Sequence, residues 1–128
     1  MDPAQALHEL TELSSQIASA VVLGADGSVL AATHDDPARA AALASTALDL
    51  VGAAFELTTQ PQEVTRVEVE LEEGAVFVLR ENGRTIAATT GPQPTSGLVV
   101  YDLRTCLQGI EEPEQKKKRA SRKAKEEA

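Results

Sequence analysis

The chain has 128 residues, of which 42% are hydrophobic and 2% aromatic, and a chain of this length suits one domain. Its single cysteine, Cys106, excludes an internal disulfide and any metal site that needs several cysteines. The formal net charge is −8, but seven of the 12 basic residues lie after Ile110, so residues 1–110 carry 5 arginines, no lysine and 15 acidic residues. This charge balance excludes a P-loop, a Schiff-base lysine and a basic nucleic-acid groove within residues 1–110. With no signal peptide and no apolar run that looks long enough to span a bilayer, we expect a cytoplasmic protein.

Two Asp-Pro pairs mark the starts of helices in the N-terminal half. In each pair Asp supplies an N-cap acceptor, and Pro has the backbone φ angle of a first helical residue. Between the pairs, two apolar runs flank the turn sequence GADG, a pattern typical of a hairpin. The expected elements are a helix from Asp2-Pro3 to about Ser15, strands over 17–23 and 28–33, and a long helix after Asp36-Pro37.

The stretch 37–57 is apolar around most of its circumference. At about 100° per residue it forms two neighbouring stripes, and a helix that covers one face of a domain needs only one stripe of about that width. We expect the first stripe to face the domain's own core and the second to face another protein chain; the alternative is that the terminal helices cover the excess. The first stripe is Ala40, Leu43, Ala47, Leu50, Ala54 and Leu57, and the second is Ala41, Ala44, Leu48, Val51 and Phe55.

From Val64 onward the hydrophobic period changes to two. Thr65, Val67, Val69 and Leu71 alternate with Arg66, Glu68, Glu70 and Glu72. This alternation predicts a strand with one wet face, and its row of charges is typical of a sheet edge.

The rest of the chain predicts a hairpin, a helix and a tail. Asn-Gly between two apolar runs is a strong hairpin signal, and apolar residues recur at helical spacing before a charged end that has no core residues. The expected elements are strands over 75–80 and 85–90, a helix from Ser96 to Ile110, and a disordered tail over 111–128.

No set of side chains in the sequence points to catalysis. His34 stands next to Asp35 and Asp36, but three neighbouring residues before a helix are better explained by a capped loop than by a tetrahedral metal site. Cys106 lies at helical spacing from Leu103, so we expect a small buried side chain rather than a nucleophile. We therefore expect no enzyme activity, no catalytic residue, no cofactor and no metal.

The order helix, strand, strand, helix, strand, strand, strand, helix predicts an α+β fold with one five-stranded antiparallel sheet. This order, with the phrases VVLGADGSVLAAT and LRENGRTIAATTGPQPTSGLVVYDL, resembles the Roadblock family over residues 7–110, so we assign residues 1–110 to one Roadblock-like domain. Longin and profilin-like domains share much of this architecture. The resemblance implies strand order 2-1-5-4-3, the long middle helix on one face of the sheet and the terminal helices on the other.

The resemblance also implies a function. Roadblock domains form homodimers in which the middle helices pack together and the third strands, here 64–71, pair into one continuous sheet. Bacterial members bind a small Ras-like GTPase and modulate its nucleotide state, and Arg39 on the polar side of the long helix is the position to test first. Two alternatives remain open, a dimeric scaffold or adaptor in a larger complex and a small-ligand sensor. The predicted dimer or partner-binding residues are Ala41, Ala44, Leu48, Val51, Phe55, Arg39, Val67 and Val69.

Overall fold

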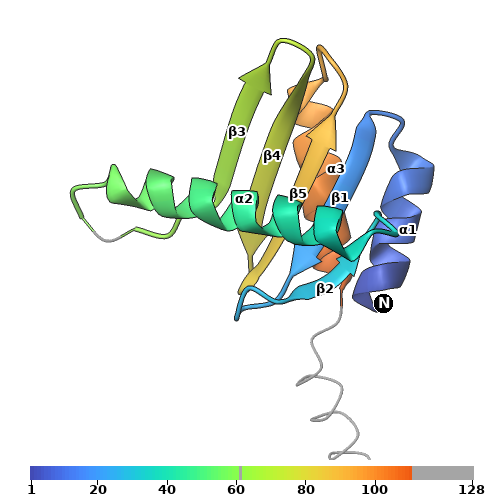
Figure 1. Cartoon of the computed structure of the whole chain (residues 1–128), viewed down its shortest axis with the longest axis horizontal. Helices are drawn as coiled ribbons and strands as arrows, with labels where there is room; N and C mark the ends of the chain where they lie inside the picture. The colour runs from blue at the N-terminus through green and yellow to red at the C-terminus, as the bar shows by residue number, and fades with distance from the viewer. Residues whose placement is uncertain (61, 111–128) are drawn as a thin grey trace, which may run out of the picture.

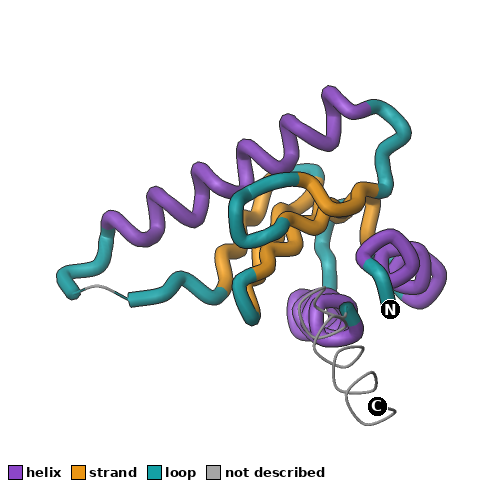
Figure 2. The backbone as a smooth tube through the Cα atoms, turned by 90° about the horizontal axis from the view of Figure 1, so that it is seen from below, coloured by secondary structure: helices purple, strands orange, loops and turns teal. Residues whose placement is uncertain are grey.

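The computed structural model describes residues 1–60 and 62–110, and within these ranges the chain forms a sheet between two helical layers (Figures 1 and 2). One long helix lies on one face of the sheet, and the first and last helices lie on the other. The elements, in chain order, are α1 (Pro3–Leu13), β1 (Ile17–Leu23), β2 (Val29–Ala32), α2 (Pro37–Glu56), β3 (Arg66–Leu71), β4 (Gly74–Glu81), β5 (Arg84–Thr90) and α3 (Ser96–Gly109). The predicted order of elements is confirmed, whereas the predicted tail over 111–128 lies outside the described residues.

The sheet has five antiparallel strands in the order β2-β1-β5-β4-β3, as the resemblance implied. Its three hairpins connect β1 to β2, β3 to β4 and β4 to β5. In the β4–β5 turn Asn82 and Gly83 both adopt a positive φ, which these two residue types tolerate best. The edges of the sheet are therefore the short β2 and the charged β3.

The helices begin where the Asp-Pro pairs predicted. The Asp2 carboxylate accepts the Gln5 N–H at 2.8 Å, and the Asp36 carboxylate accepts the Ala38 N–H at 2.9 Å. Each bond satisfies one of the free amides at a helix start. The caps fix where α1 and α2 enter their layers.

Each face of the sheet has its own hydrophobic core. Alternate side chains along one strand point to opposite faces, so Phe77 packs against α1 and α3 while the next residue, Val78, packs against α2. Both side chains are fully buried. The core on the α1 and α3 side is the larger one, because two helices cover that face.

Helix α2 alone covers the other face. By length and composition it is apolar enough to cross a membrane, which corrects the expectation that no stretch of the chain is. In the fold it lies across the sheet, and one side of it packs against Val21, Val78 and Ala87. Much of the rest of its apolar surface, including Leu48 and Phe55, is exposed.

Candidate partner-binding site

The side of α2 that faces the sheet differs in part from the predicted one. Ala44 and Val51, expected to face another chain, are buried in the protomer's own core. They lie within about 60° of Ala47, which is fully buried, so the same side of the helix carries all three. Because the helix is apolar around most of its circumference, helical periodicity alone does not show which of the two neighbouring stripes faces the sheet.

Three large apolar side chains at the C-terminal half of α2 are exposed to solvent. Leu48 is 42% exposed, Phe55 46% and Leu57 86%. The placement of Leu57 corrects the prediction that it faces the core: α2 ends at Glu56, and Leu57 follows as its C-cap. Ala41 and Arg39 are exposed near the other end of the helix, and Arg39 lies on the polar side.

The C-terminal end of α2 projects past β3, so that no strand of its own sheet lies beneath it (Figure 1). We call residues 52–57 the overhang. Its apolar members include Ala53, Phe55 and Leu57, all exposed, and a Cβ added at Gly52 would meet no atom within 4 Å. A helix end with this much uncovered apolar surface is typical of a contact with another chain.

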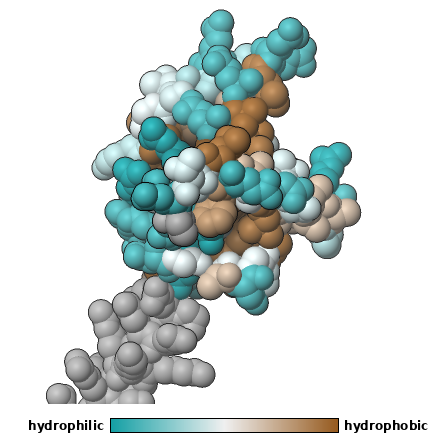
Figure 3. Space-filling model, turned by 90° about the vertical axis from the view of Figure 1, so that its left-hand side faces the viewer, coloured by the Kyte–Doolittle hydropathy of each residue, from teal (hydrophilic) through white to brown (hydrophobic). Residues whose placement is uncertain are grey.

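On the same face of the sheet, one strip is left partly uncovered by α2. Val78 and Ala87 are fully buried under the helix, but the next residues on this face, Val76 and Thr89, are only half-buried. In register beside them, Val69 is half-buried and Leu71 is 57% exposed. We call Val69, Leu71, Val76 and Thr89 the bare strip. Figure 3, which views the side of the molecule where β3 and the overhang lie, shows apolar side chains running up this side between polar ones.

The free edge of β3 offers backbone hydrogen-bonding groups. The Arg80 N–H donates to the Thr65 carbonyl at 2.9 Å, so Thr65 and Arg80 form a hydrogen-bonded pair of the β3–β4 ladder. Because such pairs alternate in antiparallel strands, the polar backbone groups of Arg66, Glu68 and Glu70 point away from β4. An unpaired edge with one apolar face is a template for another strand. The side chains of Val67 and Val69 lie on the α2 face of this edge and are half-buried.

A groove of about 340 Å³ lies on the other flank of α2. Leu48 is on this flank: it reaches toward the β1–β2 turn, where a Cβ added at Gly27 would lie 3.3 Å from its Cδ1 atom. Leu50 is about 200° away around the helix, on the flank of the bare strip. We call this depression the Arg80 groove; it is lined by Leu48, Val51, Gly52, Phe55, Gln62, Glu63, Val64 and Arg80.

Arg80 is the site residue that the sequence analysis missed. Its Nε is inaccessible to solvent and has no hydrogen-bond partner among the described residues. The sequence AVFVLR is typical of a strand near the core, but Arg80 shares the α2 face with Val76 and Val78, four and two residues earlier. An arginine in phase with core residues was the signal available in the sequence.

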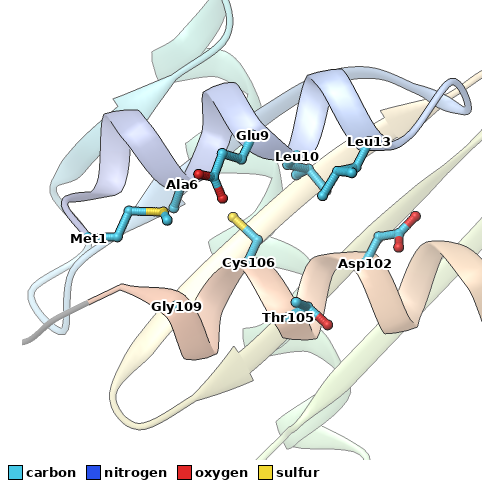
Figure 4. Close-up of a pocket in the computed structure, with 9 residues that line it drawn as sticks. All are labelled: Met1, Ala6, Glu9, Leu10, Leu13, Asp102, Thr105, Cys106 and Gly109. Atoms are coloured by element: carbon cyan, nitrogen blue, oxygen red, sulfur yellow. The ribbon is translucent and has the colours of Figure 1, made fainter.

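A smaller cleft of about 170 Å³ separates α1 from α3 (Figure 4). Cys106 and Glu9 point toward each other there, beside the Met1 side chain. Burial first, and the Glu9 carboxylate second, raise the pKa of Cys106 to about 11, so the thiol stays protonated at neutral pH. A protonated, buried thiol is a poor nucleophile, which agrees with the expected role of a small core side chain.

No group of three or more His, Cys, Asp or Glu side chains that could hold a metal ion occurs in the part of the chain that the structure describes. His34 and its acidic neighbours form the loop before α2, where Asp36 caps the helix. Four features of the described surface are suited to contacts with other chains: the overhang, the bare strip, the β3 edge and the Arg80 groove.

Comparison with known proteins gives a family and a set of similar folds. The sequence model of the Roadblock/LC7 domain matches residues 3–90. Among solved structures, the Roadblock/LC7 domain from Streptomyces avermitilis is 23% identical with a TM-score of 0.74, covering 84% of this chain and 93% of that one. A structure described as MglB with tetrameric arrangement is 16% identical (TM-score 0.59, 80% and 79% covered), and the gliding protein MglB from Thermus thermophilus is 16% identical (0.58, 81% and 84%). No curated protein sequence matches the chain.

Proposed function

This chain belongs to the Roadblock/LC7 family, and from that membership we propose that it is a homodimeric, non-catalytic regulator that binds a small Ras-like GTPase in the cytoplasm and modulates its nucleotide state. A regulatory role agrees with the family and with the MglB-like fold. The observation that carries the dimer is a match between two incomplete surfaces of the protomer: the overhang has no strand of its own sheet beneath it, and α2 covers the bare strip only in part.

A two-fold axis through the free edge of β3 would complete both surfaces at once. It would place the overhang of each copy over the bare strip of the other, while the β3 strands pair antiparallel. Leu57 of one copy would then cover Leu71 of the other. Burying a fully exposed leucine is worth about 1.5–3 kcal/mol, and the two-fold axis applies each contact twice.

The charges on β3 favour one way of pairing. Arg66, Glu68 and Glu70 lie on the face that points away from α2, and the described helices leave all three exposed. An axis at Glu68 would set Arg66 of each copy opposite Glu70 of the other, which offsets the repulsion between the two Glu68 side chains. This arrangement also brings the outward backbone groups of the two edges together.

Regulation by the dimer would come from surfaces that this pairing leaves open. Arg39 and Ala41, exposed near the start of α2, belong to the helical platform on which family members are expected to bind a GTPase. Leu48 and Phe55 lie on the flank of α2 that points away from the bare strip. We expect any effect on hydrolysis to act through the GTPase's own residues.

The decisive experiment uses the Ras-like GTPase encoded nearest to this gene. The rate of GTP hydrolysis in a single turnover, and the rate of nucleotide release, are measured with and without the full chain. A regulator changes at least one rate about tenfold, whereas a scaffold binds the GTPase and changes neither. Failure of the full chain to bind the GTPase at all would overturn the proposal.

A further inference from the structure

The Arg80 groove carries an inference beyond dimerisation, because it contains a charged donor that the protomer leaves unsatisfied. Arg80 is half-buried, and its Nε has neither solvent contact nor a hydrogen-bond partner among the described residues. Arg80 lines the groove, so a ligand oxygen would pair with the terminal N–H groups of its guanidinium rather than with the enclosed Nε.

The walls of the groove set the rest of the ligand's chemistry. Leu48 and Phe55 are each almost half exposed, and Val51 closes the base beneath them. Gly52 adds no side chain between them, so the groove is open at that point. With a volume of about 340 Å³, the groove is at the lower end of the range for sites that bury small ligands or a few side chains.

Charge decides between the anions that suit an arginine. Glu63 lines the same groove, and residues 1–110 carry 15 acidic residues against 5 arginines. One guanidinium beside a carboxylate opposes the double charge of a phosphate more than the single charge of a carboxylate, which an arginine can bind in a bidentate manner. The ligand group is therefore a carboxylate.

The position of the groove excludes the second copy as its occupant in the proposed dimer. Leu48 and Leu50 are about 200° apart around α2, and so are Phe55 and Leu57, so the groove and the bare strip lie on opposite flanks of the helix. In the proposed dimer the Leu57 flank of the overhang covers the other copy, and the Phe55 flank stays with the groove. A dimer formed through the bare strip leaves the groove open to another chain. We propose that the Arg80 groove binds a segment of a partner protein in which an aspartate or glutamate stands next to large apolar residues, the carboxylate on Arg80 and the apolar side chains between Leu48 and Phe55.

The test selects peptides from a random library on the full-length protein and measures their dissociation constants by fluorescence polarisation. Selected peptides are expected to share Asp or Glu next to Leu, Ile or Phe. Arg80→Gln should weaken the best peptide by about 10- to 100-fold, since hydrogen bonds to charged groups are worth about 1.5–3 kcal/mol. The same peptide with its acid changed to the amide should lose a similar factor on the unchanged protein, which keeps the test valid if Arg80→Gln folds poorly.

Two further variants separate this groove from general electrostatics. Glu63→Gln removes the competing carboxylate and should strengthen binding severalfold, whereas Arg104→Gln, which removes an exposed arginine from α3 on the opposite face of the sheet, should change it less than twofold. The inference is overturned if no acidic–apolar peptide is selected, or if Arg80→Gln and Arg104→Gln weaken binding equally. Sedimentation of Arg80→Gln should still show a dimer, so the proposal for the groove and the proposal for the dimer interface are tested independently.

Discussion

Replacing Glu70 by proline tests the pairing of β3 edges without touching the protomer's own ladder. The Glu70 N–H points away from β4, because Thr65 and Arg80 form a hydrogen-bonded pair and the pairs alternate from there along the strand. Proline is tolerated on an edge strand when the missing N–H faces outward. In a two-fold dimer the change removes one donor from each copy, hence two bonds at about 0.5–1.5 kcal/mol each. The dissociation constant of the dimer should rise roughly 5- to 150-fold.

Sedimentation equilibrium over a dilution series measures this constant, and urea unfolding of the monomer checks the fold. The matched control is Glu70→Ala, which removes the same carboxylate but keeps the N–H. Glu70→Pro should shift the dimer toward the 13.5 kDa monomer, while Glu70→Ala should leave most of it intact. If the folded proline variant dimerises as tightly as the alanine variant, β3 is not the pairing edge.

Three more predictions follow from single positions. Leu71→Glu places a charge on the bare strip and should give a folded monomer by sedimentation. Leu13→Glu, at an 80% exposed site on α1, should leave the dimer unchanged. If both substitutions change the dimer's dissociation constant equally, the bare strip is not part of the interface. Gly74→Ala puts a Cβ 2.4 Å from the Thr90 carbonyl oxygen and should lower the free energy of unfolding by about 1–3 kcal/mol, and an unchanged urea midpoint would refute that contact. Burial raises the pKa of Cys106 from 9.0 to about 11, so the contribution of the protonated thiol to stability is complete below pH 9 and is lost between about pH 9 and 11. Over that window Cys106→Ala should reduce the fall in the free energy of unfolding measured in urea. If the free energy of unfolding falls equally with pH in the variant and the unchanged protein, this prediction is contradicted.

The fold was predictable because local signals agreed with one another along the chain. Both Asp-Pro pairs begin helices, and the alternation over β3 gives one half-buried and one charged face. Asn82-Gly83 forms the predicted turn. Each of these signals acts over a few residues, where turn and capping chemistry dominates. The strand order came from family resemblance rather than from any residue pattern.

The candidate site was predictable only in part. The excess of apolar surface on α2 is real, but its direction was wrong for Ala44, Val51 and Leu57. Which stripe faces the sheet depends on the angle at which α2 crosses the strands and on where it passes the sheet edge, and neither is encoded in helical periodicity. Arg80 was missed because a single charged residue at a strand end is usually solvated; only the packing of α2 above it leaves the Nε without a partner among the described residues.

Amide hydrogen exchange along β3 in the full-length protein tests the central claim most directly. If two copies pair through this edge, the outward amides of Glu68 and Glu70 exchange slowly at high protein concentration, like their inward neighbours Val67 and Val69, and speed up on dilution. If the Glu68 and Glu70 amides exchange at the rate of an open edge at every concentration while Val67 and Val69 stay protected, the paired arrangement is contradicted.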